Sequence, residues 1–321
     1  MTRALVIGKF MPVHQGHISL IEFAAQQADE VIVSMSDTPT DPIPGDLRFR
    51  WLQQLFEGRP TIAVARVEDT FDDPRLPLVP RTKIWADFLS RRYPKVSVVV
   101  SSEAYGEPLA MHLGARHVLY DMARARTPVS ATQIREAPFR YWEFIPDVVR
   151  PYFVKLICLY GPESTGKSTL AKQLAEEYQT VFVPEVAREI VTSNSFTVDD
   201  IIKIGQAQTQ RVNDLRQRAN KFLFCDTDVI TTQIYSNHYL GVVPPVLYEL
   251  EKEIRYDQYF LLYPDVRWVA DGLRDLGNRR VEMFDVFKQE LVLRSIPYHL
   301  IQGDWNERFT LLKNTIEKRY R

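Results

Sequence analysis

The sequence predicts an α/β protein made of two parallel-sheet domains. Apolar runs of strand length alternate with helical stripes along the whole chain. Two strand–loop–helix units carry polar loops, one at residues 3–25 and one at residues 154–175. A chain of 321 residues is long enough for two cores. We therefore expect domains over residues 1–150 and 151–321, joined by a packed aromatic hinge and not by a flexible linker.

Composition and charge exclude several classes of protein. The net charge of −1 gives no basic field that would favour nucleic acid or an anionic membrane. Cys158 and Cys225 lie in apolar runs, so we expect core thiols and neither a disulfide nor a metal pair. No apolar run is long enough to span a bilayer, and the N-terminus lacks a signal-peptide layout. These features predict a cytoplasmic protein without nucleic-acid or membrane partners, and they leave a homo-oligomer open.

A phosphate-binding loop is the clearest motif. Residues 161–168 fit the pattern of Gly, four residues and Gly-Lys-Ser. A strand before the loop and a helix after it would aim backbone N–H groups and a helix N-terminus at one polyphosphate. Lys167 would reach the β- and γ-phosphates, and Ser168 would hold Mg²⁺. A Gly/Ser-rich turn is the alternative, and the flanking strand and helix argue against it.

Two histidines follow the first predicted strand, which Gly8 ends. His14 and His17 stand where a helix begins, with Gly16 between them. Ligands of parallel sheets bind at the carboxyl ends of strands, and imidazole N–H groups there can donate to phosphate oxygens. Two surface histidines or a zinc pair are the alternatives, although no third ligand with suitable spacing stands nearby.

Polar residues also follow strands of the second half. Glu185 ends one predicted strand, and Asp226 and Asp228 end another. Carboxylates near a phosphate loop can position Mg²⁺ or take a proton from an attacking hydroxyl. Asp228 could also cap the next helix, which is compatible with a chemical role. Residues 268–280 form an arginine-rich loop between glycines, which predicts a lid that closes Arg274 and Arg279 on phosphoryl oxygens.

The first half resembles the HxGH nucleotidyltransferase superfamily, which transfers a nucleotidyl group from ATP and releases pyrophosphate. The resemblance rests on Gly8-Lys9-Phe10 with His14-Gln15-Gly16-His17, and on residues 130–135, which match the second signature, Ser-Ser/Ala-Thr-x-x-Arg. It implies that Ser130, Arg135 and the adjacent amides hold ATP phosphates. Close relatives often carry lysine where this chain has Gln133.

The second half resembles the ribosylnicotinamide kinase domain of NadR proteins. The resemblance rests on residues 161–168, 225–228 and 268–276, and residues 141–151 are similar to the NadR linker. Both halves in this order resemble NadR-type bifunctional enzymes over nearly the whole chain. Some NadR proteins carry an N-terminal helix–turn–helix that represses transcription. The first strand starts at Arg3, so we expect this chain to lack that domain and its DNA-binding role.

The resemblance implies NAD salvage in two steps. The C-terminal domain would phosphorylate nicotinamide riboside with Mg²⁺ and ATP, and the N-terminal domain would adenylylate the product, NMN, to NAD with release of pyrophosphate. The implied catalytic residues are His14, His17, Arg135, Lys167 and Asp226. The implied ATP and NMN contacts of the first domain are Gly8, Lys9, Phe10, Gly16, Trp85, Ser130 and Thr132. The implied contacts of the second domain are Gly161, Glu163, Ser164, Thr165, Gly166, Ser168, Thr169, Arg274 and Arg279 for ATP, Glu185, Asp228 and Trp268 for the riboside, and Ser168 and Asp226 for Mg²⁺.

Several choices stay open at this point. Trp85, on a predicted helix that starts at Arg81, could stack on the nicotinamide ring or fill the core. Arg48 and Arg50 beside an apolar stripe predict a solvated helix face. Either Asp226 or Asp228 could be the base of the kinase. A coenzyme A pathway fusion enzyme and an ATP/NAD sensor with an inert site are alternative functions. The motifs that match NadR argue against the first, and the intact lysine and histidines argue against the second.

Overall fold

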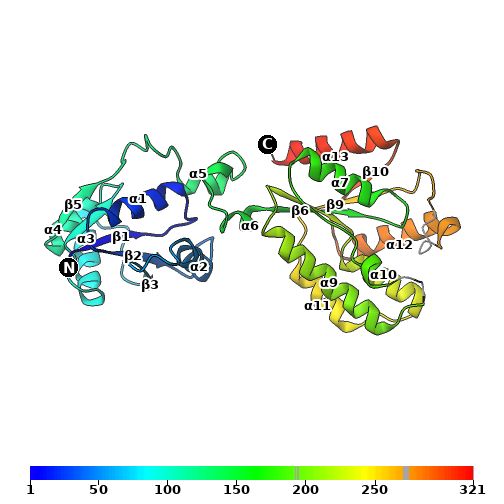
Figure 1. Cartoon of the computed structure of the whole chain (residues 1–321), viewed down its shortest axis with the longest axis horizontal. Coiled ribbons are helices and arrows are strands. Elements are labelled where there is room, and N and C mark those ends of the chain that lie inside the picture. Colours follow the sequence, from blue (N-terminus) through cyan, green and yellow to red (C-terminus); the bar gives the residue numbers. More distant parts are fainter. Residues whose placement is uncertain (192, 194, 270–274, 321) are drawn as a thin grey trace. The chain divides into compact units, whose positions relative to one another are not determined.

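The structure is a computed structural model that describes residues 1–321 except 192, 194, 270–274 and 321. The chain divides into two compact units, Met1–Arg150 and Pro151–Arg321. Within the described residues each unit contains one five-stranded parallel sheet with helices on its faces (Figure 1). The predicted α/β class with two parallel sheets is therefore confirmed. None of the described helices is long and apolar enough to cross a membrane.

The first unit has strand order β3-β2-β1-β4-β5. Its strands are β1 (Arg3–Gly8), β2 (Glu30–Asp37), β3 (Ile62–Glu68), β4 (Val98–Ser101) and β5 (Arg116–Leu119). Its helices are α1 (Gln15–Ala25), α2 (Gly45–Leu55), α3 (Leu78–Arg92), α4 (Gly106–Leu113) and α5 (Ala131–Glu136), followed by a 3₁₀ turn, η1 (Trp142–Phe144). The chain runs outward from β1 to β3 and then returns to β4 on the other side. The crevice of such a sheet lies at this reversal, beside the carboxyl ends of β1 and β4.

Two features of this unit differ from the sequence-based expectation. Helix α3 begins at Leu78 and not at Arg81, because Pro80 lies in the first helical turn, where its missing N–H costs no hydrogen bond. Helix α4 and strand β5 were not predicted. Strand β5 is an edge strand with an exposed first and last residue, so it lacks the continuous apolar run of the inner strands.

Gly106 shows how tightly α4 packs against the ends of β4 and β5. A Cβ atom at this position would lie 1.9 Å from Ser101 Oγ and 2.3 Å from His117 Nε2, two atoms that lie 3.0 Å apart in a hydrogen bond. Gly106→Ala should therefore lower the free energy of unfolding of this unit by about 1–3 kcal/mol in urea denaturation. Met111→Ala, at an exposed site of the same helix, should change it by less than about 0.5 kcal/mol. Equal effects of the two substitutions would contradict this packing argument.

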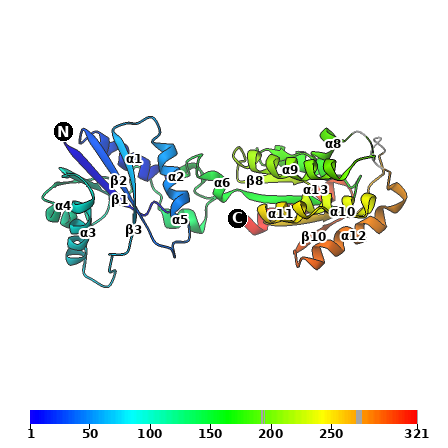
Figure 2. The ribbon, with the colours of Figure 1, turned by 90° about the horizontal axis from the view of Figure 1, so that it is seen from below.

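The second unit has strand order β10-β9-β6-β8-β7. Its strands are β6 (Lys155–Tyr160), β7 (Phe182–Val183), β8 (Phe222–Asp226), β9 (Gln258–Leu262) and β10 (Tyr298–Ile301). Its helical elements are α6 (Arg150–Phe153), α7 (Lys167–Glu177), α8 (Ala187–Ile190), α9 (Val198–Arg216), α10 (Val229–Leu240), α11 (Pro245–Glu253), η2 (Gly277–Arg279), α12 (Arg280–Leu293) and α13 (Trp305–Tyr320). Helices α7 and α13 lie on one side of the sheet, and α9 and α11 lie on the other (Figures 1 and 2).

The core of this unit places its two cysteines side by side. Cys158 of β6 is the register partner of Cys225 of β8, and both thiols are free and fully buried. Burial raises the pKa of both thiols well above the ordinary value, so neither forms a reactive thiolate near neutral pH. The predicted core position of the cysteines is therefore confirmed.

Candidate active sites

The two histidines of the first unit cap helix α1. His14 is the N-cap residue, and its Nδ1 accepts a hydrogen bond from the Gly16 N–H at 3.1 Å. His17 Nδ1 accepts from the His14 N–H at 3.3 Å, and the two ring centroids lie 3.8 Å apart. A nitrogen that accepts a backbone N–H carries no proton, so each neutral ring keeps its proton on Nε2. The capping geometry thus fixes the tautomer in which Nε2 is the donor.

The electrostatics of the pair agree with neutral rings. Burial and, to a smaller extent, the charge of Arg124 lower the pKa of His14 to about 4. Burial also lowers the pKa of His17 well below its ordinary value, helped by His14 and Arg124. Both rings are therefore neutral near pH 7 and act on an anion as hydrogen-bond donors, without a full charge.

The free energy of unfolding should depend on pH because His14 is buried as a neutral ring. Its folded pKa lies below the ordinary 6.5, so the unfolded chain binds the proton more readily and stability falls as pH drops from 6.5 towards 4. Gln in His14→Gln can still accept from the Gly16 N–H but does not titrate. The unfolding free energy of the wild type should fall relative to this variant by up to about 3 kcal/mol over that range. A difference in urea stability that stays constant with pH would contradict the buried neutral ring.

A cavity at the carboxyl ends of β1 and β4 collects most of the residues predicted for this site. The predicted residues that line it are Gly8, Lys9, Phe10, His14, Gly16, His17 and Arg135. A second cavity is lined in part by Asp72 and Trp85. It shares Gly8, Lys9 and Glu103, which follows β4, with the first cavity. Two ligands bound in these cavities would therefore meet beside Lys9, at the reversal of strand order.

The second signature of this unit shapes the site mainly through α5. Ser130 caps the helix: its Oγ accepts from the Gln133 N–H at 3.2 Å, and Gln133 Oε1 accepts from the Ser130 N–H at 2.8 Å. Arg135 lines the cavity and donates to the Met11 carbonyl and, at 3.1 Å, to Thr132 Oγ1. The side chains of Ser130 and Thr132 thus position the helix and Arg135. Neither residue is among the described residues that line the cavity.

Trp85 lies half-buried on the wall of the second cavity. Its Nε1–H donates to Asp72 Oδ1 at 2.9 Å, and the Arg81 guanidinium lies over its ring, 5.0 Å from the centroid. These contacts fix the orientation of the indole while part of it stays accessible from the cavity. The indole also packs against the core cluster that contains Ala86 and Leu89, so it fills part of the core and lines the cavity as well.

The prediction for Arg48 was wrong. Its side chain is fully buried, and its guanidinium donates to the carbonyls of Ile43 (2.9 Å) and Lys9. It also pairs at 2.6 Å with Asp41, which in turn holds Lys9 Nζ at 3.1 Å. Helical periodicity cannot reveal this, because the loop before α2 folds over the helix face that carries Arg48. Arg50 is exposed, as predicted.

In the second unit, two glycines give the phosphate-binding loop its shape. Gly161 and Gly166 have φ of +139° and +93°, and a Cβ at Gly161 would lie 2.9 Å from the Leu262 carbonyl oxygen. Lys167 opens helix α7, and its Nζ donates to the Pro162 carbonyl at 2.9 Å. An ammonium has three donors, so this contact leaves two for phosphate oxygens.

A cleft beside this loop brings together residues from α7, α8, α9 and α10. The predicted residues that line it are Glu163, Ser164, Thr165, Gly166, Lys167, Ser168, Thr169 and Glu185. Arg188 and three aromatic residues, Phe196, Tyr235 and Tyr239, also line it, and none of these four was assigned a role from the sequence. The cleft wall therefore combines the phosphate-binding loop with aromatic rings that suit a flat ligand.

Asp226 lies buried directly behind the loop. Its Oδ2 accepts a hydrogen bond from Ser168 Oγ, and its Oδ1 has no hydrogen-bond partner among the described residues. Burial and, to a smaller extent, the negative charge of Glu185 raise the pKa of Asp226 to about 6. The described residues include no cluster of three His, Cys, Asp or Glu side chains that could hold a metal. A hydroxyl beside an orphaned carboxylate oxygen fits Mg²⁺ shared with nucleotide phosphates.

The structure does not place Asp228 or Trp268 in the cleft. Asp228 caps α10, with Oδ1 accepting from the Thr231 N–H at 3.0 Å and Oδ2 from the Tyr259 hydroxyl at 2.9 Å. The helix-cap alternative is therefore correct for its geometry. Trp268 packs against Gly277, and the Arg280 guanidinium lies over its ring, 5.6 Å from the centroid. Glu185 alone of the three predicted riboside contacts lines the described cleft.

The predicted lid is described only in part. Arg274 lies outside the described residues, and Arg279 pairs with exposed Glu282 away from the described cleft wall. Instead, Arg280 donates to the Ser164 carbonyl at 3.3 Å, and Glu163 Oε1 accepts from the Leu276 N–H at 2.7 Å. The C-terminal part of this loop, residues 276–280, is thus tied directly to the phosphate-binding loop.

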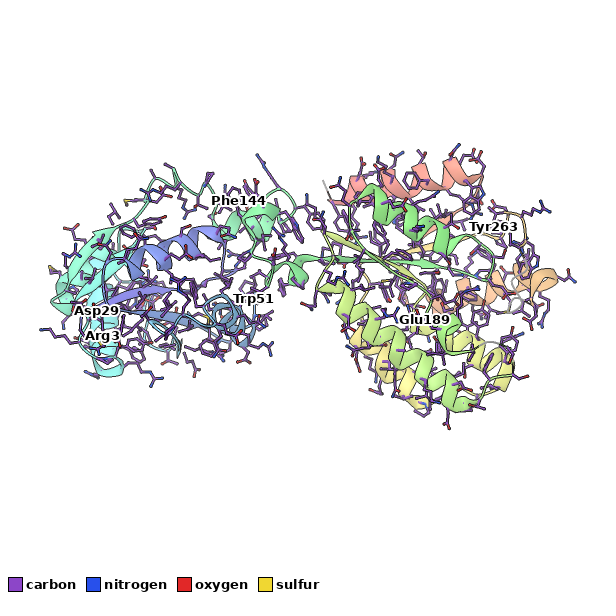
Figure 3. All side chains as sticks on the ribbon, viewed as in Figure 1. Arg3, Asp29, Trp51, Phe144, Glu189 and Tyr263 are labelled. Atoms are coloured by element: carbon purple, nitrogen blue, oxygen red, sulfur yellow. The ribbon has the colours of Figure 1, made fainter. Side chains whose placement is uncertain are left out.

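Helix α13 also holds the phosphate-binding loop in place. Arg308 is fully buried and donates to the Thr165 carbonyl at 2.8 Å, across 143 positions of the sequence. It donates as well to the carbonyl of Tyr263 at 2.7 Å, a residue labelled in Figure 3. With the Gly303 carbonyl, which accepts from Nε at 2.8 Å, and the ion pair with Asp265, four contacts compensate the burial of this guanidinium. The loop is therefore completed by the last helix of the unit.

The fold and the two sites define a chain with two ATP-dependent transferase units, a nucleotidyltransferase followed by a phosphate-loop kinase. Family models agree: one described as Cytidylyltransferase-like matches residues 5–137, and one described as AAA domain matches residues 156–308. The Escherichia coli (strain K12) "Trifunctional NAD biosynthesis/regulator protein NadR" is 34% identical over 338 residues, which cover 96% of this chain and 81% of that protein. The chain belongs to the NadR family.

Two further comparisons cover the first unit and the fold. A nicotinamide-nucleotide adenylyltransferase of Pyrococcus abyssi is 31% identical over 140 residues, 42% of this chain and 72% of that protein. A crystal structure of NadR protein in complex with NAD and AMP-PNP superposes with a TM-score of 0.82 at 22% identity, covering 99% of this chain and 96% of that one. At this identity the structural likeness supports the fold.

Proposed function

We propose that this chain is a bifunctional enzyme of NAD salvage. The second unit phosphorylates nicotinamide riboside to NMN with ATP, and the first unit adenylylates NMN to NAD with release of pyrophosphate. The observation that carries the proposal is the pair of cavities that meet at Lys9, one with the neutral histidine pair and one with Trp85. The names of the relatives support it, since NadR and nicotinamide-nucleotide adenylyltransferases act in NAD synthesis, and a NadR structure holds NR.

In the first unit, the NMN phosphate attacks the α-phosphorus of ATP in line. Lys9 lies where the two substrates meet, and His14 and His17 donate their Nε2–H groups to phosphate oxygens as charge develops there. Arg135 adds a cation on the same wall. Trp85 stacks on the nicotinamide ring. Positioning and electrostatics suffice, so the step needs no covalent enzyme intermediate.

In the second unit, Lys167 and the amides of the loop hold the γ-phosphate of ATP. Mg²⁺ held by Ser168 and Asp226 supplies neutralisation of phosphate charge when bound. Because Asp226 Oδ2 is tied to Ser168 Oγ, the carboxylate left to orient and deprotonate the riboside 5′-hydroxyl is Glu185, on the cleft wall. This assignment departs from the sequence-based choice between the two aspartates after β8.

Product analysis by chromatography tests both reactions. The pure chain is incubated with Mg²⁺-ATP and nicotinamide riboside, and separately with Mg²⁺-ATP and NMN. We expect NAD in both, with coenzyme A precursors giving no product under the same conditions. NMN without NAD would contradict the first activity. NAD from NMN but no product from the riboside would contradict the second.

A further inference from the structure

The loop between β5 and α5 is built around one carboxylate. Asp121 Oδ1 accepts from the Ala125 N–H at 2.8 Å, and its Oδ2 accepts from the N–H groups of Arg126 (3.1 Å) and Thr127 (3.3 Å). At the turn of this loop Arg124 has φ of +52°, the left-handed region. The carboxylate therefore fixes a tight loop that determines where its two arginines point.

The two arginines of this loop lie in different surroundings. Arg124 lines the cavity that also contains His14, His17 and Arg135. Its charge is close enough to lower the pKa of both histidines. Arg126 instead lies over the ring of Tyr120, 5.4 Å from the centroid, and is absent from the cavity wall of the fully described first unit. Arg124 alone of the pair faces a ligand in this cavity.

Few side chains of this cavity carry a positive charge that could bind phosphate. The histidines are neutral, and the first turn of α5 has no basic residue. Gln133 in that turn is already hydrogen-bonded to Ser130 and, at 3.2 Å, to the Tyr141 hydroxyl. Lys9 is paired with Asp41 and lies at the border of the two cavities. The cationic groups of this cavity away from that border are therefore Arg124 and Arg135.

We propose that Arg124 binds the β- and γ-phosphates of ATP, the part that leaves as pyrophosphate, in the first unit. The assignment rests on the proposed adenylyl transfer. The α-phosphorus has to lie beside Lys9, where the two substrates meet, so the remaining phosphates extend into the cavity that Arg124 lines. A guanidinium suits this role because its fork of donors matches two phosphate oxygens.

Steady-state kinetics of NAD formation by the whole chain test the assignment. Arg124→Ala should raise the KM for ATP by about 10–100-fold, the usual effect of losing a charged hydrogen-bond donor, with the KM for NMN unchanged. In the reverse reaction, from NAD and pyrophosphate, the KM for pyrophosphate should rise by a similar factor. Arg124→Lys should restore part of the loss. Arg126→Ala is the matched control, expected to stay within about twofold on every constant.

The outcomes separate this assignment from the proposed function. Phosphorylation of nicotinamide riboside should be unchanged in both variants, and the unchanged KM for NMN shows that the first unit is folded. An Arg124→Ala chain with wild-type KM values for ATP and pyrophosphate would overturn the role of Arg124 while the adenylyl transfer stands. A larger effect of Arg126→Ala would overturn it too. A wild-type chain that forms no NAD from NMN would overturn the proposed function and the assignment together.

Discussion

A chain carrying Lys167→Ala should still form NAD from NMN, but its phosphorylation of nicotinamide riboside should fall by at least about 10²–10³-fold. Lys167 is nearly buried at the start of α7 and lines the cleft, where its ammonium can follow the γ-phosphate as charge moves in the transfer. Its loss removes a cation that no neighbouring side chain of the loop replaces. The two activities are measured on the same preparation by product chromatography.

Lys172→Ala is the matched control for this substitution. Lys172 is an exposed lysine on the same helix, so both activities should stay within about twofold of the wild type. A Lys167→Ala chain that phosphorylates the riboside at the normal rate would exclude this cleft as the kinase site. A loss of both activities would show that the substitution disturbs more than the phosphate-binding loop.

The second large effect is the converse one. His17→Ala should lower the rate of NAD formation from NMN by about 10²–10³-fold and leave phosphorylation of the riboside intact. The substitution removes an Nε2–H donor and also the Nδ1 that accepts the His14 N–H, so the neighbouring ring loses its support. Both consequences act on stabilisation of the transferring phosphate.

The control for this experiment is a histidine outside the cavity of the same unit. His112, on α4, contacts the Val79 carbonyl at 3.1 Å, and His112→Ala should leave NAD formation within about twofold of the wild type. Unchanged NAD formation in His17→Ala would contradict this role of His17, whereas a wild-type chain that forms no NAD would favour the sensor with an inert first site. Together with Lys167→Ala, this variant assigns one activity to each unit.

The parts of the sites that were predictable are those in which neighbouring residues act together. The phosphate-binding loop and the capping histidines are short segments, so their spacing alone places backbone N–H groups and side chains at one helix N-terminus. The parallel arrangement of the strands also followed from general rules, because alternation of strands and helices implies right-handed crossovers. These features confirm the fold class and place His14, His17 and Lys167 on cavity walls.

The parts that sequence reasoning missed depend on contacts between distant segments. Arg48 has the pattern of a solvated residue, yet a loop folds over it, and its guanidinium serves carbonyls on three sides. Asp228 has the pattern of a helix cap, but its second contact, with the Tyr259 hydroxyl on β9, could not be read from the sequence. Tyr235 and Tyr239 lie on one helix, and their sequence pattern is the same as that of core residues. Only the position of the cleft distinguishes them.

The brace from Arg308 to the Thr165 carbonyl also bears on the order in which the two sites can form during translation. All residues of the first site precede position 151, so a ribosome completes that unit while the second is still being made. The phosphate-binding loop is synthesised early but cannot be locked until α13 follows it. Chains that terminate prematurely before Arg308 should therefore retain adenylyl transfer and lack the kinase activity. Premature termination cannot produce a chain that has the kinase unit without the first unit.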